Sequence, residues 1–161
     1  MLYQRTMPSP VGELTLCASD VGLRAILWDN SWADRIAIGE TVNEFDPAGV
    51  LAAAVRQLSE YFAGSRHEFD LALDPVGTPF QQLAWAALRT IPFGETISYG
   101  EQARRLGDPR KARAVGAANG RNPLSIVVPC HRVVGSNGAL IGFGGGLVNK
   151  AWLLDHERFV G

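Results

Sequence analysis

The sequence predicts an α+β fold of two units. The first is a small β-meander with one helix, and the second is a mainly helical C-terminal domain with a helix-turn-helix and a cysteine-bearing loop. Three observations predict it. Short alternating apolar runs joined by turn residues fill the first 28 positions, helix-capping patterns dominate from residue 78 onward, and Pro75-Val76-Gly77 separates the two regions. We therefore place the domains at residues 1–75 and 76–161.

The composition suits this fold and excludes several classes of protein. The chain has 161 residues, 47% apolar and 19% charged, which is enough for a normal core. It has no apolar run long enough to span a bilayer and no signal-peptide pattern, so we expect a cytoplasmic protein without membrane contacts. Two cysteines and three histidines without close ligand spacing predict no metal site. Cys17 is a predicted core residue, and a disulfide with Cys130 is disfavoured.

Charge is divided unevenly between the two halves. Residues 1–79 carry 5 Lys and Arg against 11 Asp and Glu, whereas residues 80–161 carry 10 against 5. A basic half indicates a polyanionic partner, although on charge alone a solvated helix face explains the cluster better. The cluster comprises Arg104, Arg105, Arg110, Lys111, Arg113 and Arg121.

Strand signals dominate the N-terminal unit. Three alternating or apolar runs predict an antiparallel meander, and they are residues 2–7, 13–19 and 23–28. Residues 29–46 are polar and irregular, which predicts a loop. Asp46, followed by proline, predicts a helix from that residue through about Ala63, with Gly64 just beyond its end. A further strand is expected at residues 69–74.

Capping patterns define the C-terminal helices. Thr78-Pro79-Phe80-Gln81 predicts a capping box and a helix that ends before Pro92. Ser98-Tyr99-Gly100-Glu101 predicts a second capping box and a short helix to Leu106, and Asp108-Pro109 predicts another helix to about Asn119. These two short helices outline a helix-turn-helix, and the basic residues near the start of the second one strengthen that interpretation.

Small residues stand out in the rest of this half. Gly116, Ala117 and Ala118 let a helix backbone approach either a surface or another helix, and the sequence favours neither alternative. The glycine-rich loop at residues 142–146 lacks the lysine and spacing of a phosphate-binding loop, so no nucleotide cofactor is predicted. A last helix is expected from Leu147 to Arg158.

The segment Val127–Val134 places Cys130 beside His131 in an apolar, strand-like run. Because Pro129 cannot donate to a sheet ladder, we expect the strand to stop there and to expose Cys130. The imidazole can accept the thiol proton, directly or through a water, and so leave the nucleophilic thiolate. Cys130 is therefore interpreted first as a nucleophile and second as a core residue.

Together these motifs resemble the O6-alkylguanine-DNA alkyltransferases. The resemblance spans the whole chain and is stronger over residues 78–157 than over residues 1–75, where it implies a ribonuclease H-like unit. The matching motifs follow the family's order and spacing, and they are Ser98-Tyr99, Arg113-Ala114-Val115-Gly116, Asn122-Pro123, Pro129-Cys130-His131-Arg132-Val133 and Leu153-Leu154-Asp155-His156-Glu157.

The resemblance implies a reaction and a role for each catalytic residue. Cys130 would accept the alkyl group, His131 would act as its base through a bound water, and Glu157 would orient the histidine. Asn122 would brace the turn that carries the cysteine, and Tyr99 would help to rotate the nucleotide out and then protonate the guanine. The methyl group of O6-alkylguanine, and that of O4-alkylthymine, would be transferred irreversibly, once per molecule and without a cofactor.

The resemblance also implies how double-stranded DNA is bound. The second helix of the helix-turn-helix would lie in the minor groove, and Arg113 would fill the space of the flipped base. The implied DNA-binding residues are Tyr99, Arg113, Ala114, Gly116, Ala117 and Arg121. The implied pocket residues are Val133, Ile141, Phe143 and Gly144. The last three differ from residues common in the family, which puts the range of substrates in question. We expect a monomer, with clustering on DNA left open.

Three alternatives use part of the same evidence. A thiol hydrolase or acyl-transfer enzyme would explain Cys130, His131 and Glu157 but not the paired capped helices. A protein that recognises alkylated bases without repairing them would lack the acceptor cysteine. A helix-turn-helix regulator would leave the Cys130 segment unexplained.

Overall fold

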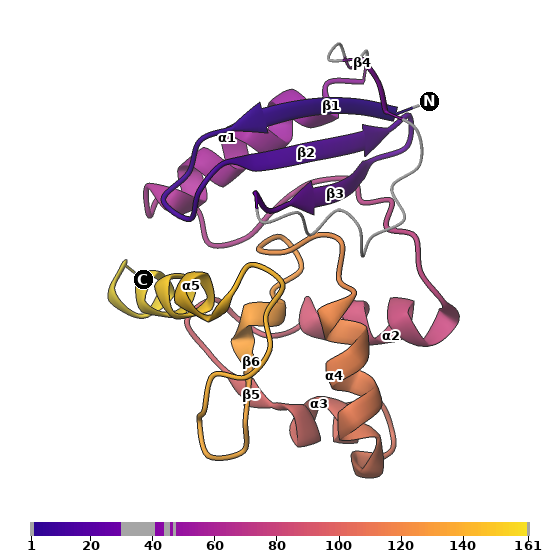
Figure 1. Cartoon of the computed structure of the whole chain (residues 1–161), viewed down its shortest axis with the longest axis vertical. Helices are drawn as coiled ribbons and strands as arrows, with labels where there is room; N and C mark the ends of the chain where they lie inside the picture. Colours follow the sequence, from indigo (N-terminus) through magenta and orange to yellow (C-terminus); the bar gives the residue numbers. More distant parts are fainter. Residues whose placement is uncertain (1, 30–40, 44–45, 47, 161) are drawn as a thin grey trace. The chain divides into compact units, whose positions relative to one another are not determined.

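The computed structural model describes residues 2–29, 41–43, 46 and 48–160. It divides into two compact units, Met1–Val76 and Gly77–Gly161, called here the N-terminal and C-terminal units (Figure 1). The N-terminal unit combines an antiparallel meander with one helix, and the C-terminal unit is mainly helical. The predicted α+β class is therefore confirmed. No helix among the described residues is both long enough and apolar enough to cross a membrane.

The N-terminal sheet has the strand order β3-β2-β1-β4. The predicted meander is confirmed, because β1 (Leu2–Met7), β2 (Leu14–Ser19) and β3 (Leu23–Leu27) pair antiparallel in sequence. The loop expected at residues 29–46 is wrong in part, since β4 (Thr41–Asn43) lies within it and pairs parallel with β1. Three residues carry too little periodicity to reveal a strand. Residues 30–40 lie outside the described part.

Helix α1 (Val50–Phe62) packs against the first three strands. It starts later than predicted because Gly49 adopts a left-handed φ of 73° and ends the preceding turn. Asp46 still acts as a capping residue, and its carboxylate accepts the backbone N–H of Leu51 at 2.8 Å. Gly64, at φ 84°, follows the end of the helix as predicted. Cys17, on β2, is fully buried in the core, as predicted.

The strand predicted at residues 69–74 is wrong. This segment forms a single parallel bridge, between Leu73 and Leu23. The N–H of Leu23 donates to the carbonyl of Ala72, and that of Asp74 donates to the carbonyl of Leu23, both at 2.8 Å. Extended backbone with one pairing residue gives the same apolar pattern as a strand but no ladder.

The α-helices of the C-terminal unit are α2 (Pro79–Leu88), α3 (Tyr99–Arg105), α4 (Ala112–Gly120) and α5 (Leu147–Val160). The first two begin at their predicted caps, Thr78 and Ser98. The capping box of α2 is confirmed by reciprocal bonds between Thr78 and Gln81. The second box is only half formed. Ser98 accepts the N–H of Glu101 at 3.0 Å, but the Glu101 carboxylate turns to the arginines at the end of α3.

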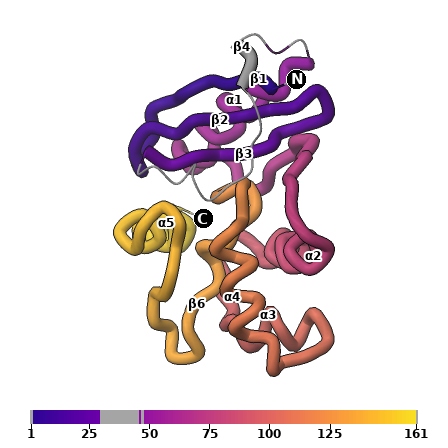
Figure 2. Tube along the Cα trace, turned by 45° about the vertical axis from the view of Figure 1, so that its right-hand side comes forward, coloured from indigo at the N-terminus to yellow at the C-terminus, as the bar shows by residue number. Residues whose placement is uncertain are grey.

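The predicted helix-turn-helix is present as α3 and α4, which pack on each other and on α2 (Figure 2). The single helix expected from Asp108 to Asn119 is corrected to a 3-10 turn, η2 (Pro109–Lys111), followed by α4. Buried polar bonds hold the helices together. Gln102 and Asn119 exchange amide hydrogen bonds at 3.1 and 2.8 Å, and Trp85 donates to the Ala118 carbonyl at 2.8 Å.

A two-stranded parallel sheet joins the start of α3 to the segment after Cys130. It pairs β5 (Ile97–Ser98) with β6 (Val133–Val134). This pairing was not predicted, because two-residue strands leave no period in the sequence. It brings Tyr99, the first residue of α3, toward the cysteine segment.

Candidate active site

Cys130 begins a 3-10 turn, η3 (Cys130–Arg132), in the C-terminal unit. The apolar residues before it do not form the expected strand. They form a buried turn in which the Val128 N–H donates to the Leu124 carbonyl at 2.8 Å and Ile126 has a φ of 78°. The expected exposure of the thiol is therefore wrong. Cys130 is only 7% exposed, because the turn folds its apolar residues around the cysteine instead of ending a strand at the surface.

Asn122 braces this turn. Its Oδ1 accepts the N–H of Leu124 at 3.0 Å, and its Nδ2 donates to the carbonyl of Val128 at 2.8 Å. Its side chain also makes a hydrogen bond with the Cys130 thiol. Asn122 is 2% exposed, so water does not compete for these bonds. One side chain thus joins both ends of the turn to the sulfur.

Burial raises the pKa of the Cys130 thiol above its ordinary value. Hydrogen bonds from Asn122 and Ser125 and the positive charge of Lys150 act in the opposite direction. Because burial raises this pKa, the resting group is a thiol. Reaction through the thiolate therefore requires a base that takes the proton as the sulfur attacks.

His131 and Glu157 form a buried hydrogen bond, the contact that the resemblance implied. The distance from Nε2 to Oε2 is 2.6 Å, and the two side chains are 0% and 1% exposed. Burial opposes ionisation of Glu157, but bonds from His131 and Arg132 hold its pKa far below the ordinary value. An ionised carboxylate only accepts, so Nε2 carries the proton and Nδ1 has a free lone pair.

The imidazole is suited to accept a proton. Burial lowers the pKa of His131 below its ordinary value, while Glu157 raises it. The ring is therefore neutral at neutral pH. Within the part of the chain that the structure describes, Nδ1 is buried and makes no hydrogen bond to protein.

Two charged residues near this pair were not predicted to have a role. Arg132 is 6% exposed and binds Glu157, and Lys150 is fully buried on α5. Spacing would have identified the lysine, since Lys150, Leu153 and Glu157 stand at i, i+3 and i+7 and so share one helix face. Arg132 gives no such signal, because it follows the histidine in an irregular turn.

Tyr99 and Lys150 meet at one backbone carbonyl. The Tyr99 hydroxyl and the Lys150 ammonium both donate to the carbonyl of Ile141 at 2.9 Å, and the ammonium also donates to the Val133 carbonyl at 2.7 Å. Burial and the nearby Cys130 raise the pKa of Tyr99, so its hydroxyl keeps its proton. The loop that carries Ile141 is thereby attached to both helices.

The remaining implied pocket residues differ in exposure. Val133 is fully buried, Phe143 and Gly144 are half-buried, and the Ile141 side chain is 53% exposed. Ile141 nonetheless approaches the chain at Gly135, where an added Cβ would lie 2.9 Å from its Cδ1. The glycine allows the turn after β6 to pack closely under the isoleucine.

Helix α4 presents the implied DNA-binding residues on its solvent face. Arg113, Ala117 and Arg121 are exposed at four-residue intervals, and Ala114 is exposed beside them. Of the three small residues, two pack within the unit and one is exposed. Ala117 faces solvent, whereas Ala118 is buried and Gly116 lies within ordinary contact distance of the Tyr99 ring.

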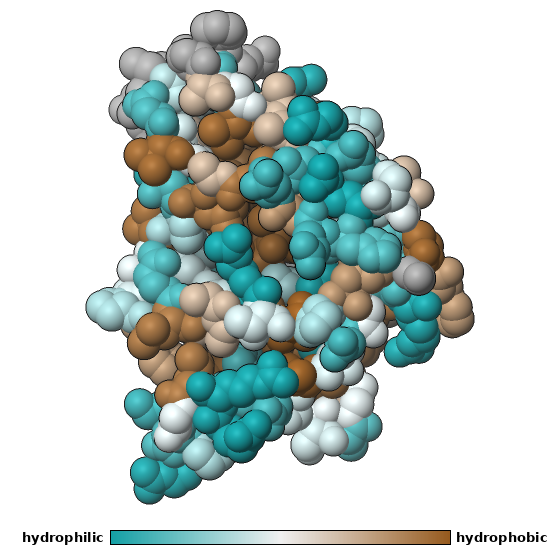
Figure 3. All heavy atoms as spheres, turned by 180° about the vertical axis from the view of Figure 1, so that it is seen from behind, coloured by the Kyte–Doolittle hydropathy of each residue, from teal (hydrophilic) through white to brown (hydrophobic). Residues whose placement is uncertain are grey.

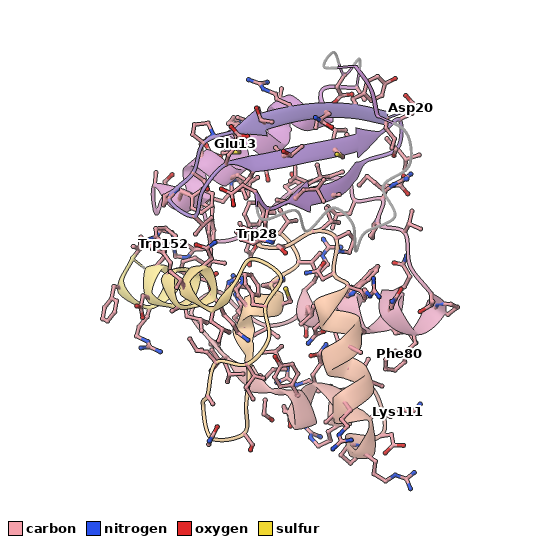
Figure 4. The ribbon with its side chains drawn as sticks, viewed as in Figure 1. Glu13, Asp20, Trp28, Phe80, Lys111 and Trp152 are labelled. Atoms are coloured by element: carbon pink, nitrogen blue, oxygen red, sulfur yellow. The ribbon has the colours of Figure 1, made fainter. Side chains whose placement is uncertain are left out.

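Several residues of the basic cluster are already paired with acids. Arg104 and Arg105 bind Glu101, and Arg110 binds Asp108. Lys111 lies 5.7 Å from the centre of the Phe80 ring, and both residues are labelled in Figure 4. Figure 3 shows hydrophilic residues gathered over the lower part of its view, where α3 and the start of α4 lie.

No group of three or more His, Cys, Asp or Glu residues that could hold a metal ion occurs among the described residues. Both cysteines are free thiols. Burial raises the pKa of Cys17 to about 11, which leaves that thiol unreactive at neutral pH.

The fold and the site define a thiol-bearing protein with a buried cysteine, histidine and glutamate beside a helix-turn-helix. Comparisons with known proteins identify the family. Residues 2–75 match the family described as 6-O-methylguanine DNA methyltransferase, ribonuclease-like domain, and residues 79–159 match its DNA binding domain. The chain therefore belongs to the 6-O-methylguanine DNA methyltransferase family.

Individual relatives match over almost their whole length. The methylated-DNA–protein-cysteine methyltransferase of Mycobacterium leprae is 49% identical over 158 residues, which is 98% of this chain and 93% of the relative. That of Salmonella typhimurium is 43% identical over 171 residues, 99% of this chain and 97% of the relative. The crystal structure of Mycobacterium tuberculosis OGT in complex with DNA superposes with a TM-score of 0.87 at 47% identity, over 98% of this chain and 94% of that one.

Proposed function

We propose that this protein repairs DNA by transferring the alkyl group of O6-alkylguanine in duplex DNA to its own Cys130. The observation that carries the proposal is the buried hydrogen-bonded pair His131–Glu157, whose histidine directly follows Cys130 in a chain of this family. A relative solved in complex with DNA supports DNA as the partner.

The proposed chemistry is a displacement at carbon. The Cys130 sulfur forms a bond to the alkyl carbon as the bond from that carbon to guanine O6 breaks. The thiol proton passes to Nδ1 of His131 through a bound water, and the departing guanine gains a proton from Tyr99. The lone pair of Nδ1 and the protonated hydroxyl of Tyr99 support these two roles.

The product explains why each molecule would act once. S-alkylcysteine is a stable thioether, because returning the alkyl group would require a thiolate to leave from an unactivated alkyl carbon. The only reactants are the damaged base and the thiol, so the reaction needs no cofactor. Protein is therefore consumed in a one-to-one ratio with repaired bases.

Base flipping is required because O6 lies inside the base stack, and extrusion costs a few kcal/mol. We propose that α4 enters the minor groove and that Arg113 occupies the vacated space. The exposed side chain of Arg113 and the small exposed Ala114 and Ala117 beside it support a close approach of this face. The same geometry would admit O4-alkylthymine.

The acceptor is tested by transfer from a duplex with one radiolabelled O6-methylguanine. Cys130→Ala should abolish labelling of the protein but retain DNA binding, whereas the matched control Cys17→Ala should transfer at the wild-type rate. Labelled Cys130→Ala would contradict the assignment. Turnover of a thioester or ester by the wild type would favour the thiol hydrolase.

Base flipping is tested by comparing two substrates. Arg113→Ala should slow repair of the duplex much more than reaction with free O6-benzylguanine, which needs no extrusion. Arg110→Ala is the control, because Arg110 is exposed but already paired with Asp108. An equal loss on both substrates would argue against insertion of Arg113. A duplex with O4-methylthymine tests the second base.

A further inference from the structure

Arg132 is buried, and every nitrogen of its guanidinium donates a hydrogen bond. Its Nε donates to Oε1 of Glu157 at 2.8 Å, its Nη2 donates to Oε2 at 3.0 Å, and its Nη1 donates to the carbonyl of Ile91 at 2.6 Å. Its guanidinium also lies 5.8 Å from the centre of the Phe93 ring. The three hydrogen bonds and the Phe93 ring therefore fix the plane of the Arg132 guanidinium.

The guanidinium of Arg132 determines where each carboxylate oxygen of Glu157 points. Oε2 accepts from both His131 and Arg132, while Oε1 accepts from Arg132 and from the N–H of Gly94 at 3.2 Å. A bidentate pair restricts rotation of the carboxylate more than a single bond does. The oxygen that meets the histidine is therefore held in place by the arginine.

Stability alone gives a weak reason for such a pair. Desolvation of two charges offsets most of their attraction, and apolar residues of similar volume often stabilise a buried site as well. The ion pair of Arg132 and Glu157 nevertheless lies directly beside His131, which the proposed reaction uses. We propose that Arg132 is a positioning residue that fixes the Glu157 carboxylate against His131 and balances its charge, an inference that rests on the proposed alkyl transfer.

The charge of Arg132 also acts on the imidazole of His131. The charged groups that act on His131 are Glu157 and Lys150 from α5 and Arg132 from its own turn. Glu157 favours the protonated ring, whereas Arg132 and Lys150 oppose it. Burial is the main cause that keeps the ring neutral, and Arg132 adds to it by opposing Glu157. Without Arg132, Glu157 would raise the pKa of the ring and so favour an imidazolium, which is no base.

The test compares Arg132→Gln, which removes the charge, with Arg132→Lys, which keeps the charge but loses the fork. Arg158→Gln is the matched control, because Arg158 is exposed on the same helix as Glu157. Single-turnover methyl transfer from duplex DNA is measured across pH 5.5–9, and rates are corrected for the folded fraction found by urea titration.

We expect Arg132→Gln to slow transfer about 100-fold at neutral pH and to move the acidic limb of the rate profile to higher pH. Arg132→Lys should keep the position of that limb at a lower plateau, and the control should match the wild type. A wild-type profile for Arg132→Gln would overturn the inference. No transfer to wild-type Cys130 at any pH would instead overturn the proposed function.

A second measurement needs no folded variant. The ¹⁵N shifts of His131 in the wild type should show a neutral ring protonated at Nε2 at neutral pH. An imidazolium, or a proton on Nδ1, at neutral pH would contradict the proposed balance.

Discussion

Substitution of Asn122 by alanine tests the brace of the cysteine turn. The variant loses the bond to the Val128 carbonyl and leaves the buried N–H of Leu124 without its acceptor. A lost bond costs about 1 kcal/mol and an unsatisfied buried donor about 1–3 kcal/mol, so we expect a loss of about 2–4 kcal/mol in the free energy of unfolding. The Val128 carbonyl keeps the N–H of Cys130, which limits the loss.

Urea unfolding followed by circular dichroism measures this loss, and methyl transfer to Cys130 measures its effect on the sulfur. Asn122→Asp is the informative companion, because it keeps the acceptor for Leu124 but turns a negative charge toward Val128 and the thiol. It should be more stable than Asn122→Ala at equal or lower transfer rate. A change below about 0.5 kcal/mol for Asn122→Ala, the usual range of surface substitutions, would refute the role of the brace.

Three further outcomes follow from the site. Lys150→Met should raise the pKa of the Cys130 thiol further, because it removes a nearby positive charge. Iodoacetamide labelling of the Cys130 peptide should then require a higher pH. An unchanged dependence of labelling on pH would exclude that charge effect. Ile126→Ala should be less stable than Ile126→Gly by about 1 kcal/mol, the reverse of the usual order, because φ is 78° at this position; urea titration decides it. Glu157 has a lowered pKa when folded, so its stabilisation is complete above the unfolded value and declines as pH falls below about 4.3. Glu157→Gln should accordingly flatten the loss of stability between pH 5 and 3 by up to about 1.4 kcal/mol per pH unit, and parallel curves would contradict this.

Features set by local chemistry were predicted from the sequence. The cap at Thr78 and the helix end at Gly64 depend on residues within a few positions of one another. The meander follows from alternating runs that turn residues separate. The hydrogen bond between His131 and Glu157 was anticipated only through the resemblance, since 26 positions separate the two residues. No local pattern connects them.

Features set by packing were missed or wrong. The apolar residues before Cys130 satisfy a strand pattern and a buried turn equally well, and burial of the thiol depends on which one forms. Lys150 and Arg132 are charged, and charged side chains lie at the surface unless a partner holds them inside. Their partners, the Val133 carbonyl and Glu157, come from distant parts of the chain. The β5–β6 pair is too short to leave a pattern.

The central claim is that Cys130 itself takes the alkyl group. It is tested most directly by the intact mass of the wild type after incubation with an excess of duplex containing O6-methylguanine, followed by peptide mapping. We expect a gain of one methyl group, confined to the Cys130 peptide and never exceeding one per molecule. An unmodified Cys130 peptide while the duplex is bound, or a methyl group on Cys17, would contradict the claim.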